Sequence, residues 1–167
     1  RSRRQRQMCI RDSGDPSRFS HYNIPTFPDT IQGFLGPLAG ILSGLRWAQK
    51  SNANCIISVA ADTPFFPRDL VEKLVTATAD MEEPLALAVT RDENGKVVRH
   101  PTFGIWPVSL ADHLEESLSQ GLRKIVLWVD QHHCRLVDFD QSLFDPFFNV
   151  NSPEDLSKAE IILGVKK

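Results

Sequence analysis

The chain has 167 residues, of which 41% are hydrophobic and 24% are charged, and its formal net charge at pH 7 is −2. These values describe one ordinary globular domain with a hydrophobic core, and they argue against a disordered or fibrous chain. The small net charge gives no reason to expect nucleic acid as a partner, because nucleic-acid binders usually carry a basic patch, so a small-molecule ligand is the better expectation.

The first thirteen residues, RSRRQRQMCIRDS, differ in composition from the rest, since four of the first six are arginine. No apolar periodicity follows them. We expect a disordered or non-native leader here, and the alternative is a basic arm that binds anions. Residues 14–167 are then expected to form a single domain.

A segment punctuated by prolines, HYNIPTFPD, contains a short extended piece that ends at Asp29, and the glycines of IQGFLG mark a loop after it. A helix is predicted over residues 37–50, because Pro37 suits a first helical turn and apolar residues recur at helical spacing. These apolar residues are Leu38, Ile41, Leu42 and Leu45.

The next segments alternate strand and helix. The continuous apolar run CIISVA, residues 55–60, predicts a strand buried on both faces, as in parallel α/β sheets. Residues 68–79 predict a helix with one apolar face, and LALAV, residues 85–89, predicts another buried strand.

The pair Asn94-Gly95 predicts a β-hairpin, so the sheet becomes antiparallel locally, and HPTFGIW continues as a strand. The segment SLADHLEESLSQG predicts a helix, and Gly121 suits the position just after its end. Residues 124–133 fit a strand by composition and a helix by the spacing of their apolar residues, and we favour the helix.

The chain closes with a short strand, CRLVDF, and a helix within NSPEDLSKAEIILG. Ser152 is placed to cap this helix, with Pro153 first inside it and Asp155 three residues after the cap. The whole order predicts an α/β fold with a mostly parallel, Rossmann-like open sheet and helices on both faces.

Asp62 lies just after the predicted strand 55–60, within SVAADTPFFP. Open α/β sheets bind ligands at the carboxyl ends of their strands, and a carboxylate in a turn stiffened by Pro64 and Pro67 can hold Mg²⁺ where phosphates arrive. The alternative is an acid that only starts the helix near Arg68.

Four segments resemble, in this order, motifs of the molybdenum cofactor guanylyltransferase family: GPLAGILSGL (36–45), ADTPFFPRDL (61–70), RHPTFGIW (99–106) and FNVNSPEDL (148–156). The resemblance runs from about Gly14 to the end. It implies a fold of the nucleotide-diphospho-sugar transferase type. It also implies transfer of GMP from GTP to molybdopterin or its molybdenum form, which gives molybdopterin guanine dinucleotide and pyrophosphate.

On the nucleotide side, Asp62 matches the family's magnesium ligand and is the expected catalytic and nucleotide-binding carboxylate, with Mg²⁺ as cofactor. Asp29 matches an acidic position that the family uses in guanine nucleotide binding. Attack of a phosphate oxygen on an α-phosphate needs positioning and charge neutralisation more than a covalent nucleophile. The attacking phosphate is already ionised near neutral pH, so no general base is expected.

On the pterin side, Asn149 and Asn151 match asparagines of the family, and Gly36 and His100 are further candidates for pterin binding. Each also has a structural interpretation. The asparagines can satisfy loop backbone, His100 can be a structural histidine, and Gly36 can serve close packing or a tight loop.

The family opens with a strand and a glycine-rich loop that carries an arginine and a lysine and holds the nucleotide. These 167 residues contain no such segment, so we expect a chain that lacks this N-terminal part, binds GTP weakly and turns over poorly. Two alternatives stay open. One is a related transferase, such as a molybdopterin cytidylyltransferase or a nucleotide-sugar enzyme, and the other is a noncatalytic pterin-binding module.

The three cysteines, Cys9, Cys55 and Cys134, are too few and too scattered for a disulfide framework, which favours the cytoplasm. No apolar run approaches the roughly 20 residues of a membrane helix. A zinc site at His132, His133 and Cys134 is disfavoured, because adjacent side chains point in different directions. Partners of the family would include GTP, molybdopterin and molybdoenzyme chaperones.

Overall fold

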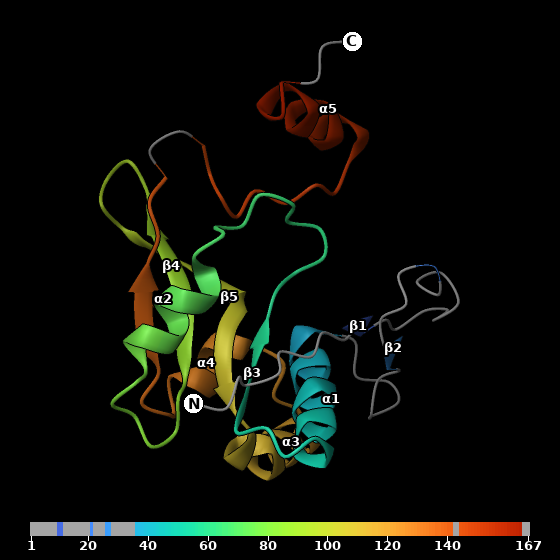
Figure 1. Cartoon of the computed structure of the whole chain (residues 1–167), viewed down its shortest axis with the longest axis vertical. Coiled ribbons are helices and arrows are strands. Elements are labelled where there is room, and N and C mark those ends of the chain that lie inside the picture. The colour runs from blue at the N-terminus through green and yellow to red at the C-terminus, as the bar shows by residue number, and fades with distance from the viewer. Residues whose placement is uncertain (1–9, 12–20, 22–25, 28–35, 142–143, 165–167) are drawn as a thin grey trace, which may run out of the picture. The chain divides into compact units, whose positions relative to one another are not determined.

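The computed structural model describes residues 10, 11, 21, 26, 27, 36–141 and 144–164, and its architecture is α/β (Figure 1). The chain divides into two compact units. One consists of Arg1–Ile56 and Trp106–His132, and the other of Ile57–Ile105 and His133–Lys167.

Four strands form the main sheet in the order β3-β5-β4-β6. Their bounds are Cys55–Ser58 (β3), Ala86–Arg91 (β4), Val97–Pro107 (β5) and Arg135–Asp138 (β6). Strand β4 runs antiparallel to β5 and parallel to β6. The predicted α/β class is confirmed, with a mixed sheet.

The predicted hairpin joins β4 to β5. The backbone N–H of Asp92 donates to the carbonyl of Lys96 at 3.0 Å. The Asp92 carboxylate accepts the backbone N–H groups of Asn94 and Lys96, each at 2.9 Å, and Gly95 has φ 76°. The aspartate therefore closes the turn, and glycine supplies the positive φ that it requires.

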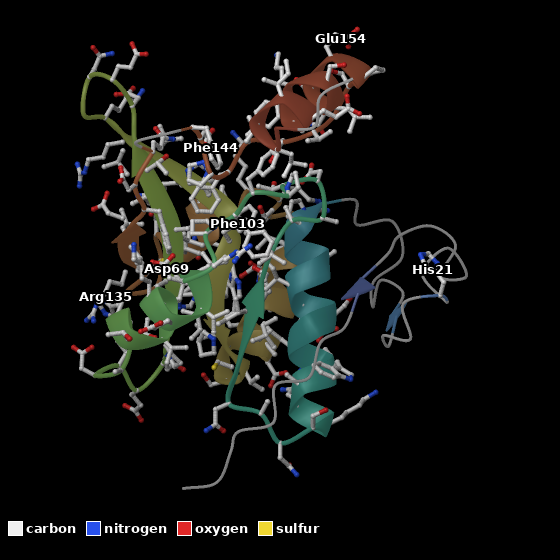
Figure 2. The ribbon with its side chains drawn as sticks, turned by 45° about the horizontal axis from the view of Figure 1, so that its top comes forward. His21, Asp69, Phe103, Arg135, Phe144 and Glu154 are labelled. Carbon is white, nitrogen blue, oxygen red and sulfur yellow. The ribbon has the colours of Figure 1, made fainter. Side chains whose placement is uncertain are left out.

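In the second unit, helix α2 (Leu70–Ala77) packs on β4 and β6 (Figure 1). Leu70 and Leu74 are its buried residues. Arg135, labelled in Figure 2, lies at the start of β6. It forms an ion pair with Asp80 at 2.7 Å and donates to the carbonyl of Ala77. The start of β6 is thus tied to the end of α2.

Helix α5 (Pro153–Ile162) closes the second unit, and its predicted cap is confirmed. The Ser152 hydroxyl oxygen accepts the backbone N–H of Asp155 at 3.2 Å and donates to the Asp155 carboxylate at 2.9 Å. Only Ala159 of this helix is buried.

In the first unit, helix α1 (Pro37–Lys50) matches the predicted bounds. It packs against α3 (Ala111–Ser119), as Figure 1 shows, and against the 3₁₀ turn η2 (Val108–Leu110). Arg46 of α1 forms ion pairs with Asp112 and Glu115 of α3. The core of this unit includes Leu38, Ile41, Leu42, Leu45, Trp106, Leu114 and Trp128.

Residues 124–133, which fit either a strand or a helix, contain helix α4 (Ile125–Val129), so the favoured prediction of a helix is confirmed. Ile125, Trp128 and Val129 are buried, which is the helical spacing rather than the alternation of a strand. No helix among the described residues is long and apolar enough to cross a membrane.

Strand β1 (Ile10–Arg11) pairs in parallel with β2 (Thr26–Phe27) in a separate two-stranded sheet. Two residues of the expected leader are therefore in a strand. The other residues of 1–13 lie outside the described residues, so the leader stays a prediction. Asp29 also lies outside them.

The prediction for residues 55–60 is wrong in one respect. Strand β3 ends at Ser58, its residues are only half-buried, and Val59 is 47% exposed. By contrast, the first five residues of β4 are all buried. Strand β3 is the last strand of the described sheet, where side chains have fewer neighbours, and an apolar run does not distinguish a central strand from a terminal one.

Candidate active site

Asp62 lies in a turn that follows the carboxyl end of β3, where the sequence placed it. Its side chain is exposed, and its one hydrogen-bonding neighbour among the described residues is the Thr63 hydroxyl at 3.3 Å. No lysine or arginine of the described residues forms an ion pair with it. Most of the carboxylate's lone pairs therefore face solvent.

Two hydrogen bonds tie this turn to the segment that carries Asn149. The backbone N–H of Val150 donates to the carbonyl oxygen of Asp62 at 2.8 Å. The Thr63 hydroxyl donates to Asn149 Oδ1 at 2.6 Å, and Thr63 is 1% exposed. The second and fourth sequence motifs therefore meet, and Asp62 and Asn149 lie in one site.

Asn151 lies two residues further along, next to the cap of α5. Its backbone N–H donates to the Asp155 carboxylate at 3.3 Å, and its side chain is exposed. The hydrogen bond from the Ser152 hydroxyl is the main cause that holds the pKa of Asp155 below its ordinary value. The cap fixes the backbone at Asn151 and leaves the amide available.

His100 of β5 is partly buried and has two structural partners. Its Nε2 lies 2.8 Å from the Thr90 hydroxyl, and its ring stacks on Phe147, with centroids 4.0 Å apart and planes at 21°. Burial lowers the pKa of His100, and the charge of Asp145 opposes this effect. Burial therefore favours the neutral imidazole, and a contact with substrate stays a prediction.

Further aromatic rings pack around Phe147, which stacks on His100 and lies two residues before Asn149. Phe147 makes edge contacts with Phe103 and Phe139, at centroid distances of 4.8 and 5.7 Å, and Phe66 lies 5.9 Å from Phe103. Figure 2 shows Phe103 and Phe144 in this part of the second unit. The backbone N–H of Phe147 donates to the Asp145 carboxylate at 2.9 Å.

Gly36 lies in the first unit, directly before α1, and its carbonyl accepts the N–H of Ala39 at 3.2 Å. Apart from the chain neighbours of Gly36, no atom of the described residues lies within 4 Å of a Cβ added there, so they provide no close packing. That role belongs to Gly44, where an added Cβ would lie 2.8 Å from Ile56 Cδ1. Pterin binding by Gly36 stays a prediction.

The donor set fits a hard divalent cation held mainly by substrate. Mg²⁺ is usually bound by one or two carboxylates together with phosphate oxygens and waters. Asp62 offers one exposed carboxylate, and the described residues contain no group of three or more His, Cys, Asp or Glu side chains that could hold a metal. His132 lies instead beside His113, with their nitrogens 3.2 Å apart.

Sequence reasoning missed Thr63 and Phe147. Thr63 follows Asp62 directly, so a hydroxyl beside the candidate ligand was a visible signal. Its partner, Asn149, is 86 residues away, and no local pattern announces that contact. Phe147 precedes the fourth motif by one residue, and only the fold shows that it stacks on His100.

Residues 6–134 match the model of the MobA-like NTP transferase domain. Among curated relatives, a molybdenum cofactor guanylyltransferase of Bradyrhizobium sp. is 41% identical over 162 residues, which cover 95% of this chain and 74% of that protein. One of Mesorhizobium japonicum is 38% identical over 161 residues, covering 93% of this chain and 75% of that protein.

Solved structures show the same fold. The molybdopterin-guanine dinucleotide biosynthesis protein A from Archaeoglobus fulgidus matches with a TM-score of 0.71 at 23% identity, over 95% of this chain and 79% of that one. The 2-C-methyl-D-erythritol 4-phosphate cytidylyltransferase from Thermus thermophilus matches with a TM-score of 0.64 at 16% identity, over 98% and 85%.

Proposed function

The chain belongs to the MobA-like NTP transferase family, and from that premise we propose that it acts as a guanylyltransferase of molybdenum cofactor synthesis. It transfers GMP from GTP to molybdopterin or its molybdenum form and releases pyrophosphate. The observation that carries this proposal is the sequence identity with guanylyltransferases along nearly the whole chain. The meeting of Asp62 and Asn149 in one site supports it.

In the proposed reaction, a terminal phosphate oxygen of the pterin attacks the α-phosphorus of GTP. The new P–O bond forms as the bond to the β-phosphate breaks, and the electron pair leaves with pyrophosphate. The attacking phosphate is ionised near neutral pH, so the site needs to align the two phosphates rather than remove a proton.

Asp62 is the residue that would hold Mg²⁺, through its exposed carboxylate. When bound, the cation supplies neutralisation of phosphate charge. The chain's own contribution is to fix where that carboxylate stands, because the carbonyl of the same residue accepts the N–H of Val150. The carboxylate and the asparagine segment are thereby held in register.

Asn149 and Asn151 are the proposed contacts on the pterin side. Both are exposed, and a side-chain amide offers donor and acceptor together, which suits a heterocycle edge or a phosphate. His100 and Gly36 are secondary candidates for the same substrate, and Asp29 is the candidate for guanine nucleotide binding.

The proposal that the donor is GTP rather than CTP rests on sequence identity. Cytidylyltransferases share the fold, so the fold alone does not select the base. The two relatives at 41% and 38% identity both carry the name guanylyltransferase, which favours GTP.

We place the reaction in the cytoplasm, with molybdoenzyme chaperones among the proteins that would take up its product. The three cysteines of the sequence are too few and too scattered for a disulfide framework, which suits a reducing compartment. Neither proposal affects the assignment of the reaction.

The test uses the protein as its gene encodes it, with molybdopterin as acceptor and either GTP or CTP as donor, and follows pyrophosphate release. We expect release and dinucleotide formation with GTP and little with CTP. Preference for CTP would favour the related cytidylyl transfer, and pterin retention without pyrophosphate release would favour the noncatalytic module.

A further inference from the structure

Thr63 occupies an unusual position in this site. Its side chain is buried, with 1% of the residue exposed, yet within the described part of the chain its hydroxyl has as hydrogen-bonding neighbours the exposed side chains of Asp62 and Asn149. Its hydroxyl lies 2.6 Å from Asn149 Oδ1 and 3.3 Å from Asp62 Oδ1. Thr63 thus connects a proposed metal ligand with a proposed substrate contact from below the surface.

The two distances decide where the single hydroxyl hydrogen points. A separation of 2.6 Å is typical of an O–H···O hydrogen bond and short for an N–H···O one, so the hydroxyl donates to the amide oxygen of Asn149. The contact with Asp62, at 3.3 Å, is the long one. The Asp62 carboxylate therefore keeps its acceptor capacity, and the Asn149 amide has a fixed orientation.

This orientation has a chemical consequence. With Oδ1 engaged by Thr63, Asn149 presents its Nδ2 hydrogens to the solvent side of the site as a donor. We propose that Thr63 is a positioning residue for the transfer reaction: its hydroxyl locks the Asn149 amide so that the NH₂ group donates to an acceptor oxygen of the pterin substrate. This inference rests on the proposed function.

The backbone lets this role be separated from a purely structural one. The hydrogen bond from the Val150 N–H to the Asp62 carbonyl, at 2.8 Å, holds the two segments together without the threonine hydroxyl. Removing only the hydroxyl should free the amide to rotate, while the path of the loop is kept. Thr63→Val does this at nearly constant volume, and Thr63→Ser keeps the hydroxyl as the matched control.

The kinetic test compares wild type, Thr63→Val, Thr63→Ser, Asn149→Ala and the double variant Thr63→Val/Asn149→Ala. We expect Thr63→Val to raise the KM for molybdopterin by about tenfold, with the KM for GTP unchanged, because one oriented hydrogen bond is lost. Thr63→Ser should behave as wild type. In the Asn149→Ala background, Thr63→Val should have no further effect.

Three outcomes would overturn the positioning role. They are wild-type kinetics in Thr63→Val, equal losses for GTP and molybdopterin that serine does not rescue, and an undiminished effect of Thr63→Val in the Asn149→Ala background. A wild-type protein that transfers nothing would instead overturn the proposed function.

A second measurement needs no substrate and reads the amide directly. In ¹H–¹⁵N spectra of the whole protein, the side-chain NH₂ signals of Asn149 should be well dispersed in wild type and in Thr63→Ser. In Thr63→Val the chemical shifts of these protons should move toward those of an asparagine side chain that is free in solvent. Unchanged Asn149 signals in Thr63→Val would contradict the proposal, whatever the activity.

Discussion

At the scale of single residues, the site depends on which polar groups are engaged and which are left open. Asp62 uses its backbone carbonyl to hold Val150 and leaves its carboxylate at the surface. Asn149 uses one end of its amide for Thr63. In both residues, one group fixes the position and another remains for a ligand.

Asp62→Asn keeps the size of the side chain and removes its charge. We expect turnover to fall by at least about two orders of magnitude, because a metal held near transferring phosphates contributes several kcal/mol to transition-state stabilisation. Pyrophosphate release at several Mg²⁺ concentrations measures this. Asp69→Asn is the control, since Asp69 is exposed and pairs with Lys73 at 3.2 Å. If pyrophosphate release by Asp62→Asn depended on Mg²⁺ in the same way as in wild type, Asp62 would not be the metal ligand.

His100 gives a prediction for the pH dependence of stability. Burial lowers its pKa in the folded state, so the unfolded chain binds the proton more readily. The free energy of unfolding should therefore fall as the pH drops below about 6.5, the ordinary pKa of histidine, toward the lower folded-state pKa. Above about 6.5, both states are neutral at this residue and its contribution is complete.

Urea unfolding at about pH 7.5 and about pH 5.5 measures this change, and His100→Gln is the comparison. The variant cannot titrate, so its free energy of unfolding should change less between the two pH values than that of wild type. An equal change in both proteins would show that His100 does not contribute. The rest of the sequence is the same in the two proteins, so the comparison isolates His100.

At the scale of elements, the ends and caps of helices were predicted well, because they depend on residues that are close together in the sequence. Pro37 and the apolar spacing after it gave α1 with both bounds, and the Ser152 cap gave the start of α5. The exposure of β3 could not be read in the same way, because burial depends on which strand lies beside it. An apolar run of β-branched residues looks the same in a central and a terminal strand.

Gly121 ends α3 in the manner expected from sequence. Its φ is 95°. The N–H of Gly121 donates to the carbonyl of Leu118 at 3.1 Å, and the N–H of Leu122 donates to the carbonyl of Ser117 at 3.0 Å. This pattern is a Schellman motif, in which any other residue would be strained.

We expect Gly121→Ala to lower the free energy of unfolding by about 1 kcal/mol, through that backbone strain. Gln120→Ala is the matched control, because Gln120 has φ −77° and tolerates a side chain there. Chemical denaturation of the three proteins measures the difference. Equal stability of Gly121→Ala and wild type would mean that the helix end rearranges.

At the scale of the whole molecule, the candidate site is built from motifs far apart in the sequence. Resemblance to a family grouped Asp62 with Asn149 and Asn151, although nothing local relates them. The fold then added Thr63 and Phe147, because their roles consist of contacts with residues distant along the chain. The candidate ligands could thus be named from the sequence, whereas the residues that orient them were found only in the structure.

Substrate binding should be visible in the stability of the whole protein. A ligand that binds only the folded state at about 100 times its Kd stabilises it by about 2.7 kcal/mol, which raises Tm by about 5–10 °C for a chain of this size. We expect that rise with GTP and Mg²⁺ in a thermal scan. Removal of the metal with EDTA, or Asp62→Asn, should abolish it, and an unchanged rise with EDTA would contradict metal-dependent binding.

The bond between the Thr63 hydroxyl and Asn149 spans 86 positions of the chain, and this spacing has a consequence during biosynthesis. A ribosome adding about 5–20 residues per second needs roughly 4–17 s to produce the second partner after the first. Throughout that interval the nascent chain carries the turn without the segment that completes it. The candidate site can therefore be completed only after residue 149 has been made and has folded back onto the turn at Thr63.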